Sequence, residues 1–299
     1  MVGIEASAQI GWIGMGKMGL PICRRLLGAG FRVRVLCRNG ATESIATTNG
    51  FEVARTISET AKGADVVSSA ISDDRALVDI TLADGGLKDC LSREQVYIDM
   101  STVSPEASAR VAEVISHIGC GYLRAPVSGS TATAMQGALT ALVSGPAEAF
   151  GAMAGFFAAF TKKAFLVGSG EEARYLKLAI NAMLGATSAL LAESLLLARK
   201  GGMDIQTIMD VVSESVVASP LIQYKRGAVT TGDYTAAFSV SQMLKDFDLI
   251  EQAAAATSCD IPLISKIRNE YRDAVERGLG DKDFFVLTSP DLGPVPSAK

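Results

Sequence analysis

In the first half of the chain, short apolar runs alternate with segments whose apolar residues recur every three or four positions. The runs predict strands, and the periodic segments between them predict amphipathic helices. The expected strands are residues 9–13, 32–37, 65–70, 95–99, 122–125, 139–143 and 164–167. The expected helices are residues 18–29, 74–82, 105–117 and 147–160. Strands that alternate with helices predict βαβ crossovers and therefore a mainly parallel sheet.

The pattern changes after residue 170, because no further strand signal follows. Residues 171–200 are rich in Ala and Leu and contain no proline, so they predict one helix of about 45 Å. Further helices are expected over residues 205–215, 240–257 and 262–277. The sequence therefore predicts two domains, an α/β domain at residues 1–169 and an all-helical domain at 170–299. Since helix 171–200 is apolar nearly all round, we expect other helices and a second subunit to cover it.

Gly14, Gly16 and Gly19 form a G-x-G-x-x-G sequence between the first expected strand and the first expected helix. This spacing permits a tight turn, close approach of the backbone to a pyrophosphate, and close packing of the helix on the strand. The phosphates would lie at the positive end of the helix dipole. The strand–turn–helix context predicts a dinucleotide site, and a glycine-rich turn without a ligand is the alternative.

The end of the second expected strand bears on which dinucleotide binds. An NAD site typically has an acidic residue about 20 residues after the glycines, where a carboxylate binds the ribose 2′-hydroxyl. This chain has Cys37, Arg38 and Asn39 there, and no acid. Because a guanidinium matches the oxygens of a 2′-phosphate, NADP is the preferred cofactor and NAD is the second choice. The alternative interpretation of Arg38 is an ordinary surface cation.

Composition restricts the remaining chemistry. The 299 residues include 28 Lys and Arg and 32 Asp and Glu, a net charge of −4, which gives no signal for nucleic acid or an anionic membrane. His117 is the single histidine, which excludes sites that need two, so we expect no metal. It lies outside every motif, and we interpret it as a surface or capping residue.

The cysteines bear on localisation. The five cysteines are scattered and form no C-x-x-C pair, and the chain has no apolar run of about 18 residues. Both observations favour a reduced cytoplasmic protein.

Several segments stand in the order typical of one enzyme family. They are IGMGKMGLP at 13–21, DMSTVSP at 99–105, APVSGS at 125–130, KLAIN at 177–181, and Lys245 followed by Asp246. On these segments, residues 9–285 resemble the β-hydroxyacid dehydrogenase family, typified by 3-hydroxyisobutyrate dehydrogenase and tartronate semialdehyde reductase. The resemblance implies reversible hydride transfer between NADP(H) and a small 3-hydroxy acid or its semialdehyde. It also implies a Rossmann-type NADP-binding domain, followed by a helical substrate and oligomerisation domain like that of 6-phosphogluconate dehydrogenase.

The same resemblance implies a role for each segment. Lys177 is the expected catalytic residue, as proton donor and acceptor. The expected substrate-binding residues are Ser128, Gly129, Ser130 and Asn181. The expected cofactor-binding residues are Gly14, Met15, Gly16, Lys17, Met18, Gly19, Arg38, Asn39, Ile71, Ser72, Ser101, Thr102 and Lys245. We expect a small anionic hydroxy acid as substrate, and a homodimer or homotetramer that binds neither nucleic acid nor membrane.

Helix geometry supports the assignment of Lys177. Lys177 and Asn181 are four residues apart, so they share one helix face and can contact one substrate together. The lysine can accept the hydroxyl proton as hydride leaves the carbon, and return it in the reverse reaction. Lys245 has two interpretations, a group that binds the cofactor or a surface ion pair with Asp246.

Two departures from the family pattern bear on which substrate binds. Arg124 stands where the family usually has an acid, and Ser130 where its loop usually has a glycine. Both changes alter an anion pocket, although Arg124 could equally pair with a structural carboxylate. Three other functions stay open: an imine reductase, which generally lacks the lysine; an oxidative decarboxylase, whose acid is replaced here by Leu184; and an inactive dinucleotide-fold module that binds partners.

Overall fold

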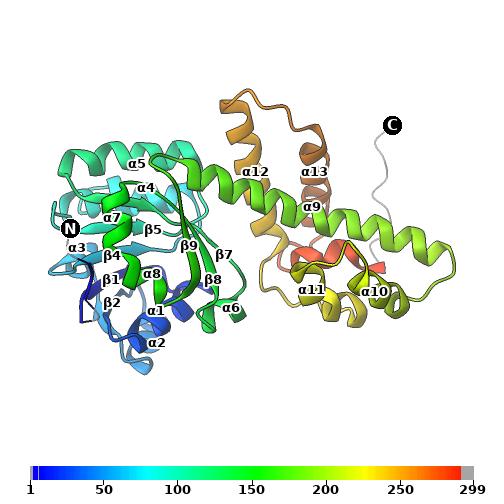
Figure 1. The fold of residues 1–299 in the computed structure, drawn as a ribbon, viewed down its shortest axis with the longest axis horizontal. Helices are drawn as coiled ribbons and strands as arrows, with labels where there is room; N and C mark the ends of the chain where they lie inside the picture. Colours follow the sequence, from blue (N-terminus) through cyan, green and yellow to red (C-terminus); the bar gives the residue numbers. More distant parts are fainter. Residues whose placement is uncertain (1–2, 6, 291–299) are drawn as a thin grey trace. The chain divides into compact units, whose positions relative to one another are not determined.

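The computed structural model describes residues 3–5 and 7–290 of the chain (Figure 1). These residues divide into two units, one that ends at Lys177 and one that begins at Leu178. The division falls within α9 (Glu172–Lys200), the helix expected over residues 171–200. The domain limits at residues 169 and 170 remain a prediction of the sequence.

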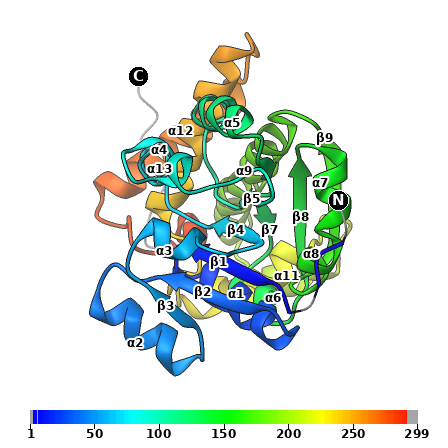
Figure 2. The ribbon, with the colours of Figure 1, turned by 90° about the vertical axis from the view of Figure 1, so that its left-hand side faces the viewer.

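The described part of the first unit contains a nine-stranded sheet (Figure 2). Its strands are β1 (Gln9–Ile13), β2 (Arg32–Leu36), β3 (Glu52–Ala54), β4 (Val66–Ser69), β5 (Val96–Asp99), β6 (Gly121–Arg124), β7 (Val127–Ser128), β8 (Leu139–Ser144) and β9 (Thr161–Gly168). They are ordered β3-β2-β1-β4-β5-β6-β8-β7, and β9 pairs with β8. The neighbours from β3 to β6 are parallel, as are β8 and β9, whereas β8 is antiparallel to β6 and β7. The predicted mainly parallel sheet is confirmed.

Helices cover both faces of this sheet. They are α1 (Gly19–Gly28), α2 (Gly40–Thr48), α3 (Ile57–Ala61), α4 (Asp74–Leu82), α5 (Pro105–Ile118), α6 (Thr131–Met135), α7 (Ala147–Ala152), α8 (Ala154–Ala158) and the 3-10 helix η1 (Leu87–Asp89). Alternate strand residues enter two separate cores, because successive side chains of a strand point to opposite faces. Val66 joins the core that contains Ile22 of α1, and Val67 joins the core that contains Leu77 of α4 and Val111 of α5.

The seven strands predicted from the sequence are all present, six within one residue at each end, while β9 begins three residues early. The pattern missed β3 and β7, which have three and two residues, and the short helices α2, α3 and α6. The single helix expected over residues 147–160 was wrong. It is divided into α7 and α8 because Met153, with φ −91° and ψ 12°, leaves the helical conformation.

The described part of the second unit is helical apart from two isolated β-bridges. Besides its share of α9 it contains α10 (Ile205–Glu214), α11 (Pro220–Thr231), α12 (Val240–Ala256), α13 (Pro262–Glu276) and the 3-10 helix η2 (Phe284–Thr288). Its core gathers Leu191 and Leu195 of α9 with Phe247, Tyr271 and Phe285. The sequence predicted this helical region but missed α11.

One face of α9 remains exposed in the described chain. The side chains of Met183, Leu190 and Leu197 are 62%, 69% and 76% exposed, so no other described helix covers them. Among the described residues, α9 alone is long and apolar enough to cross a membrane. This is weak evidence, because the core helix of a globular unit has the same length and composition, and α9 also supplies Leu191 and Leu195 to a core.

Candidate functional site

The glycine loop joins β1 to α1 and fits a bound pyrophosphate. Gly14 has φ +105°, and a Cβ atom there would lie 2.2 Å from the Ala70 carbonyl oxygen. A Cβ atom on Gly19 would lie 2.0 Å from the Gly14 carbonyl oxygen, whereas one on Gly16 would meet no atom within 4 Å. Two glycines are therefore required by protein packing, and the third leaves open space beside the N-terminus of α1. A dinucleotide phosphate requires such a space.

The end of β2 offers a cation and no carboxylate at the predicted position. Arg38 and Asn39 are exposed, and Arg38 has no ion pair in the described part of the chain. The Asn39 side chain caps α2 by accepting a hydrogen bond from the Thr42 backbone N–H at 2.9 Å. The next acid, Glu43, pairs with Arg55 at 2.7 Å. These residues fit a 2′-phosphate better than a free 2′-hydroxyl.

The loops after β4 and β5 lie beside the glycine loop because β1, β4 and β5 are parallel neighbours. The Ile71 backbone N–H donates to Ser101 Oγ at 2.9 Å, and Ser101 Oγ donates to Asp99 Oδ1 at 2.7 Å. Ser72 Oγ donates to the carboxylate of Asp73 at 2.6 Å. The structure thus brings together the predicted cofactor residues on these three loops and joins two of the loops through one buried serine.

The predicted substrate loop is partly used by the fold itself. Val127 and Ser128 form β7, which pairs with β8. Gly129 has φ +141°, and a Cβ atom there would lie 2.5 Å from Thr133 Oγ1. Ser130 caps α6, since its Oγ accepts from the Thr133 N–H and its N–H donates to Thr133 Oγ1. The hydroxyl of Ser130 is therefore engaged, and that of Ser128 is the better candidate for a ligand.

Two ion pairs hold the start of α9 to the sheet, one from its first turn and one from Glu171, the residue before the helix. Arg174 pairs with Asp99 of β5 at 2.6 Å, and both side chains are fully buried. Arg124 of β6 pairs with Glu171 at 2.5 Å, with little exposure of either side chain. Arg124 therefore pairs with a structural carboxylate, one of the two interpretations that the sequence left open. Lys177 follows Arg174 by three residues and is partly exposed.

Burial raises the pKa of two phenols beside the Arg174 ion pair. Tyr97 and Tyr122 stack with ring centroids 5.2 Å apart, and desolvation raises the pKa of both hydroxyls. Burial alone would lower the pKa of the Arg174 guanidinium, but the charge and hydrogen bond of Asp99 outweigh it and the pKa is raised. The arginine thus stays charged and the phenols stay protonated, so these groups form a fixed hydrogen-bond network.

Asn181 lies one turn after Lys177 on α9, and its contacts belong to the second unit. Its amide Nδ2 donates to Asp246 Oδ2 on α12 at 2.5 Å, and Lys245 Nζ lies 2.9 Å from Asp246 Oδ1. Asn181 is 3% exposed, and its Oδ1 has no hydrogen-bond partner in the described structure. Because a carboxylate only accepts hydrogen bonds, Asp246 orients the amide so that Oδ1 stays available for a donor.

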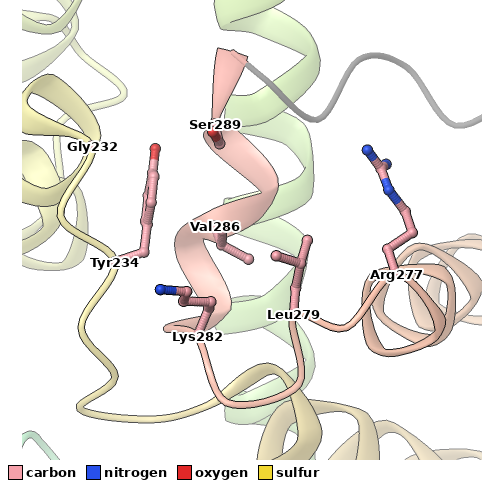
Figure 3. A pocket seen from close by; sticks show the side chains of 7 residues that line it. All are labelled: Gly232, Tyr234, Arg277, Leu279, Lys282, Val286 and Ser289. Carbon is pink, nitrogen blue, oxygen red and sulfur yellow. The ribbon is translucent and has the colours of Figure 1, made fainter.

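The remaining candidates lie outside these groups. His117 is exposed, and its ring nitrogen contacts the Glu113 carbonyl oxygen at 2.7 Å, near the end of α5. Leu184, at the position of the decarboxylase acid, packs against the core of the second unit. A pocket of the second unit is lined by Gly232, Tyr234, Arg277, Leu279, Lys282, Val286 and Ser289 (Figure 3). None of these seven residues was predicted to act in the site.

Three residues that contact the predicted site were not singled out from the sequence for this purpose: Asp99, Arg174 and Asp246. Asp99 and Asp246 stood inside motifs that were interpreted through their neighbours. Arg174 carried one signal, a charged side chain on a helix otherwise rich in apolar residues. Its partner is 75 positions away in the chain, so no local pattern could identify the pair.

Comparisons with known proteins cover nearly the whole chain. Residues 9–168 match the NAD binding domain of 6-phosphogluconate dehydrogenase, and residues 168–289 match the NAD-binding region of NADP-dependent 3-hydroxyisobutyrate dehydrogenase. The uncharacterized oxidoreductase YfjR of Bacillus subtilis is 31% identical over 281 residues, 93% of this chain and 98% of that protein. Glyoxylate/succinic semialdehyde reductase 1 of Arabidopsis thaliana is 28% identical, with 93% and 96% covered. The solved structure of Mycobacterium tuberculosis 3-hydroxyisobutyrate dehydrogenase with L-serine is 25% identical, with a TM-score of 0.85 over 94% of this chain and 98% of that one.

Proposed function

Since the chain belongs to the 3-hydroxyisobutyrate dehydrogenase-type family of NAD(P)-dependent hydroxyacid dehydrogenases, we propose that it transfers a hydride reversibly between NADP(H) and a small 3-hydroxy acid or the matching semialdehyde. The observation that carries this proposal is the face of α9 on which Lys177 precedes Asn181 by one turn. The buried Oδ1 of Asn181 has no hydrogen-bond partner among the described residues. An ammonium and an amide oxygen on one helix face suit a substrate hydroxyl, which both donates and accepts hydrogen bonds.

In the oxidation direction, the neutral amine of Lys177 accepts the hydroxyl proton and becomes the ammonium, while the carbon–hydrogen bond breaks and the carbonyl double bond forms. The bound dinucleotide supplies the hydride acceptor at its nicotinamide ring. In the reduction direction, Lys177 returns the same proton to the carbonyl oxygen. Ser128 is the candidate donor to the substrate carboxylate. The hydroxyl proton thus moves to and from Lys177, and the hydride moves between the substrate carbon and the dinucleotide.

The preference for NADP is supported by the end of β2. Arg38 is exposed and has no ion pair in residues 3–5 and 7–290, and the nearby Glu43 is engaged by Arg55. A guanidinium there binds a 2′-phosphate through parallel N–H groups. The semialdehyde reductase and hydroxyacid dehydrogenase named among the relatives support a small carbonyl or hydroxy acid substrate. We also place the enzyme in the cytoplasm, because its five cysteines show no spacing of a disulfide framework.

The test is a kinetic panel of hydroxy acids, semialdehydes and imines, measured by nicotinamide absorbance with NADP(H) and NAD(H). We expect turnover of a 3-hydroxy acid or semialdehyde with a higher kcat/KM for the NADP pair. Lys177→Ala should lower kcat by at least ~100-fold because the proton loses its acceptor, while NADPH binding, measured by fluorescence, persists. Lys200→Ala on the same helix is the control and should retain full activity. Turnover of imines alone, or near-normal activity of Lys177→Ala, would contradict the proposal.

A homo-oligomer belongs to the same proposal. Met183, Leu190 and Leu197 are seven residues apart, so they lie on one face of α9, two turns from one another. If α9 of a second copy packs antiparallel to this helix, with the two copies of Leu190 in contact, Met183 of each copy would contact Leu197 of the other. This spacing is self-complementary, as a two-fold interface requires. Light scattering of the full chain should give at least twice the mass of one chain, and a strictly monomeric mass would contradict the dimer.

A further inference from the structure

Arg174 makes hydrogen bonds from all three nitrogens of its guanidinium, although its side chain has no exposed surface. The bonds run from Nε to Ser108 Oγ at 3.1 Å, from Nη1 to the Ser101 carbonyl oxygen at 2.8 Å, and from Nη2 to Asp99 Oδ2 at 2.6 Å and to the Tyr122 hydroxyl at 3.1 Å. The planar fork of donors fixes direction as well as distance. The first turn of α9 is therefore held against β5 in one rotational and axial position.

The network continues from Asp99 to two loops that carry predicted cofactor-binding residues, the loop at Ile71 and the loop at Ser101. Asp99 Oδ1 accepts hydrogen bonds from Ser69 Oγ and Ser101 Oγ, and Ser101 Oγ accepts from the Ile71 N–H. Ser69 is the last residue of β4, and Asp99 is the last residue of β5. A single buried cluster thus connects the helix turn before Lys177 with the ends of two strands.

Apolar packing would hold this turn less exactly in place, because van der Waals contacts lack direction. Removing two charges from water is unfavourable. A protein in which apolar side chains of similar volume replace a buried ion pair is often at least as stable. Stability is thus a weak reason for a buried ion pair at this point. The contacts suggest another reason. Besides Ser108 of α5 and Tyr122 of β6, the pair binds Ser69 at the end of β4 and Ser101 in a loop of the site, and Arg174 itself lies in the turn of α9 before Lys177.

We propose that Arg174 is a positioning residue, which with Asp99 fixes Lys177 relative to the loops at Ile71 and Ser101. The inference rests on the proposed role of Lys177 but concerns a residue that touches neither substrate nor cofactor. Arg124 provides the matched comparison. It also ties the start of α9 to the sheet, through Glu171, but none of its hydrogen bonds reaches either loop.

The first test compares Arg174→Lys with Arg124→Lys in the full chain. Each variant keeps the charge and removes the fork of donors. Arg174→Lys should lower kcat by ~10- to 100-fold with little change in the KM for NADPH, because a small displacement of a catalytic group is costly. Its isotope effect with NADPH deuterated at the transferred hydrogen should rise, since chemistry becomes slower than release of product. Arg124→Lys should change neither quantity. An unchanged kcat and isotope effect in a folded Arg174→Lys protein would overturn the proposal and leave only a structural role.

The second test does not depend on turnover. Hydrogen–deuterium exchange of Arg174→Lys should quicken both in the first turn of α9 and in the loop at Ile71, whereas Arg124→Lys should leave the exchange of the loop at Ile71 as it is in the wild type. Equal exchange at Ile71 in the two variants would contradict the inference. If Arg174→Lys does not fold, Asp99→Asn serves in its place, because it keeps an oxygen for the guanidinium. If the wild-type chain turns over no substrate, the proposed function fails, and the exchange experiment alone decides whether the network couples these segments.

Discussion

Two ion pairs of the described chain are almost completely removed from solvent, one in each unit, and their surroundings differ. Asp99–Arg174 in the first unit is enclosed by hydroxyl and carbonyl groups of Ser101, Ser108 and Tyr122. Several of these groups belong to, or bind, loops of the predicted site. The pair is therefore part of a polar network that extends to positions where a ligand is expected.

Lys225–Asp283 in the second unit joins α11 to η2 and is surrounded by aromatic rings. The Lys225 ammonium lies 2.7 Å from both carboxylate oxygens and about 5 Å from the ring centroids of Tyr224 and Phe284. Asp283 also accepts from the Phe285 N–H at 3.1 Å. These contacts stay inside the core of the helical unit, and none leads to a predicted site residue.

Burial of a charge therefore does not by itself identify a functional site. Both pairs carry a similar desolvation cost. The two pairs differ in what surrounds them. Asp99 is hydrogen-bonded to a loop of the predicted site, whereas Asp283 lies in an aromatic core. We therefore expect changes at the first pair to affect catalysis and changes at the second to affect stability.

The largest effect is expected for Lys225→Met, which leaves Asp283 charged and unpaired among aromatic rings. The free energy of unfolding, measured by urea denaturation with circular dichroism, should fall by ~3–5 kcal/mol. The double variant Lys225→Met with Asp283→Asn should recover most of this loss, because the amide oxygen still accepts from the Phe285 N–H without a charge. A loss in the single variant below ~1 kcal/mol would remove the contrast between the two pairs.

A smaller effect is expected for Glu171→Gln, which weakens the partly exposed pair with Arg124. The glutamine keeps an oxygen that accepts from the guanidinium, so the loss in the free energy of unfolding should be about 1–2 kcal/mol. The control Glu94→Gln removes a carboxylate from an exposed pair with Arg93 and should leave stability unchanged. If Glu171→Gln costs no more than Glu94→Gln, burial of the Arg124 pair contributes nothing measurable.

The sequence was sufficient for the sheet and the glycine loop because both depend on local patterns. Apolar runs mark strands that are buried on both faces, and the spacing of Gly14, Gly16 and Gly19 reflects two close backbone approaches and one open position. The short strands β3 and β7 escaped detection because three or two residues carry no periodicity. The sequence did not predict the division between α7 and α8, although Gly151 and Gly155 lie two residues on either side of Met153, because an isolated glycine is tolerated within a helix.

The contacts of the site were less accessible from sequence. Asp99 and Arg174 are 75 positions apart, and Arg124 and Glu171 are 47 apart, so each pair forms only through the fold. Ser130 was predicted to bind an anion although a local signal for a helix cap was present, namely a threonine three residues later. The orientation of Asn181 depends on Asp246, 65 positions away. Motif resemblance thus predicted the site residues, and only the structure supplied their partners.

The smallest effect on stability is expected for Cys120. Unlike the two ion pairs, this ionisable group is buried without an opposite charge. Cys120 is 6% exposed, and desolvation raises the pKa of its thiol to about 11. The folded state therefore keeps the thiol neutral, and stability is lost only as pH rises above the unfolded pKa of about 8.5 towards 11. Between pH 7 and pH 9.5, this thiol should lower the free energy of unfolding by ~1 kcal/mol.

Cys120→Ala isolates that contribution. The fall in unfolding free energy between pH 7 and pH 9.5 should be smaller in the variant than in the wild type, since other buried groups titrate equally in both proteins. Cys259→Ala, which removes an exposed thiol, should leave the pH dependence as it is in the wild type. An identical pH dependence for Cys120→Ala and the wild type would show that this thiol ionises inside the fold. A buried group of the first unit would then hold a charge without a partner, contrary to the rule drawn from the two ion pairs.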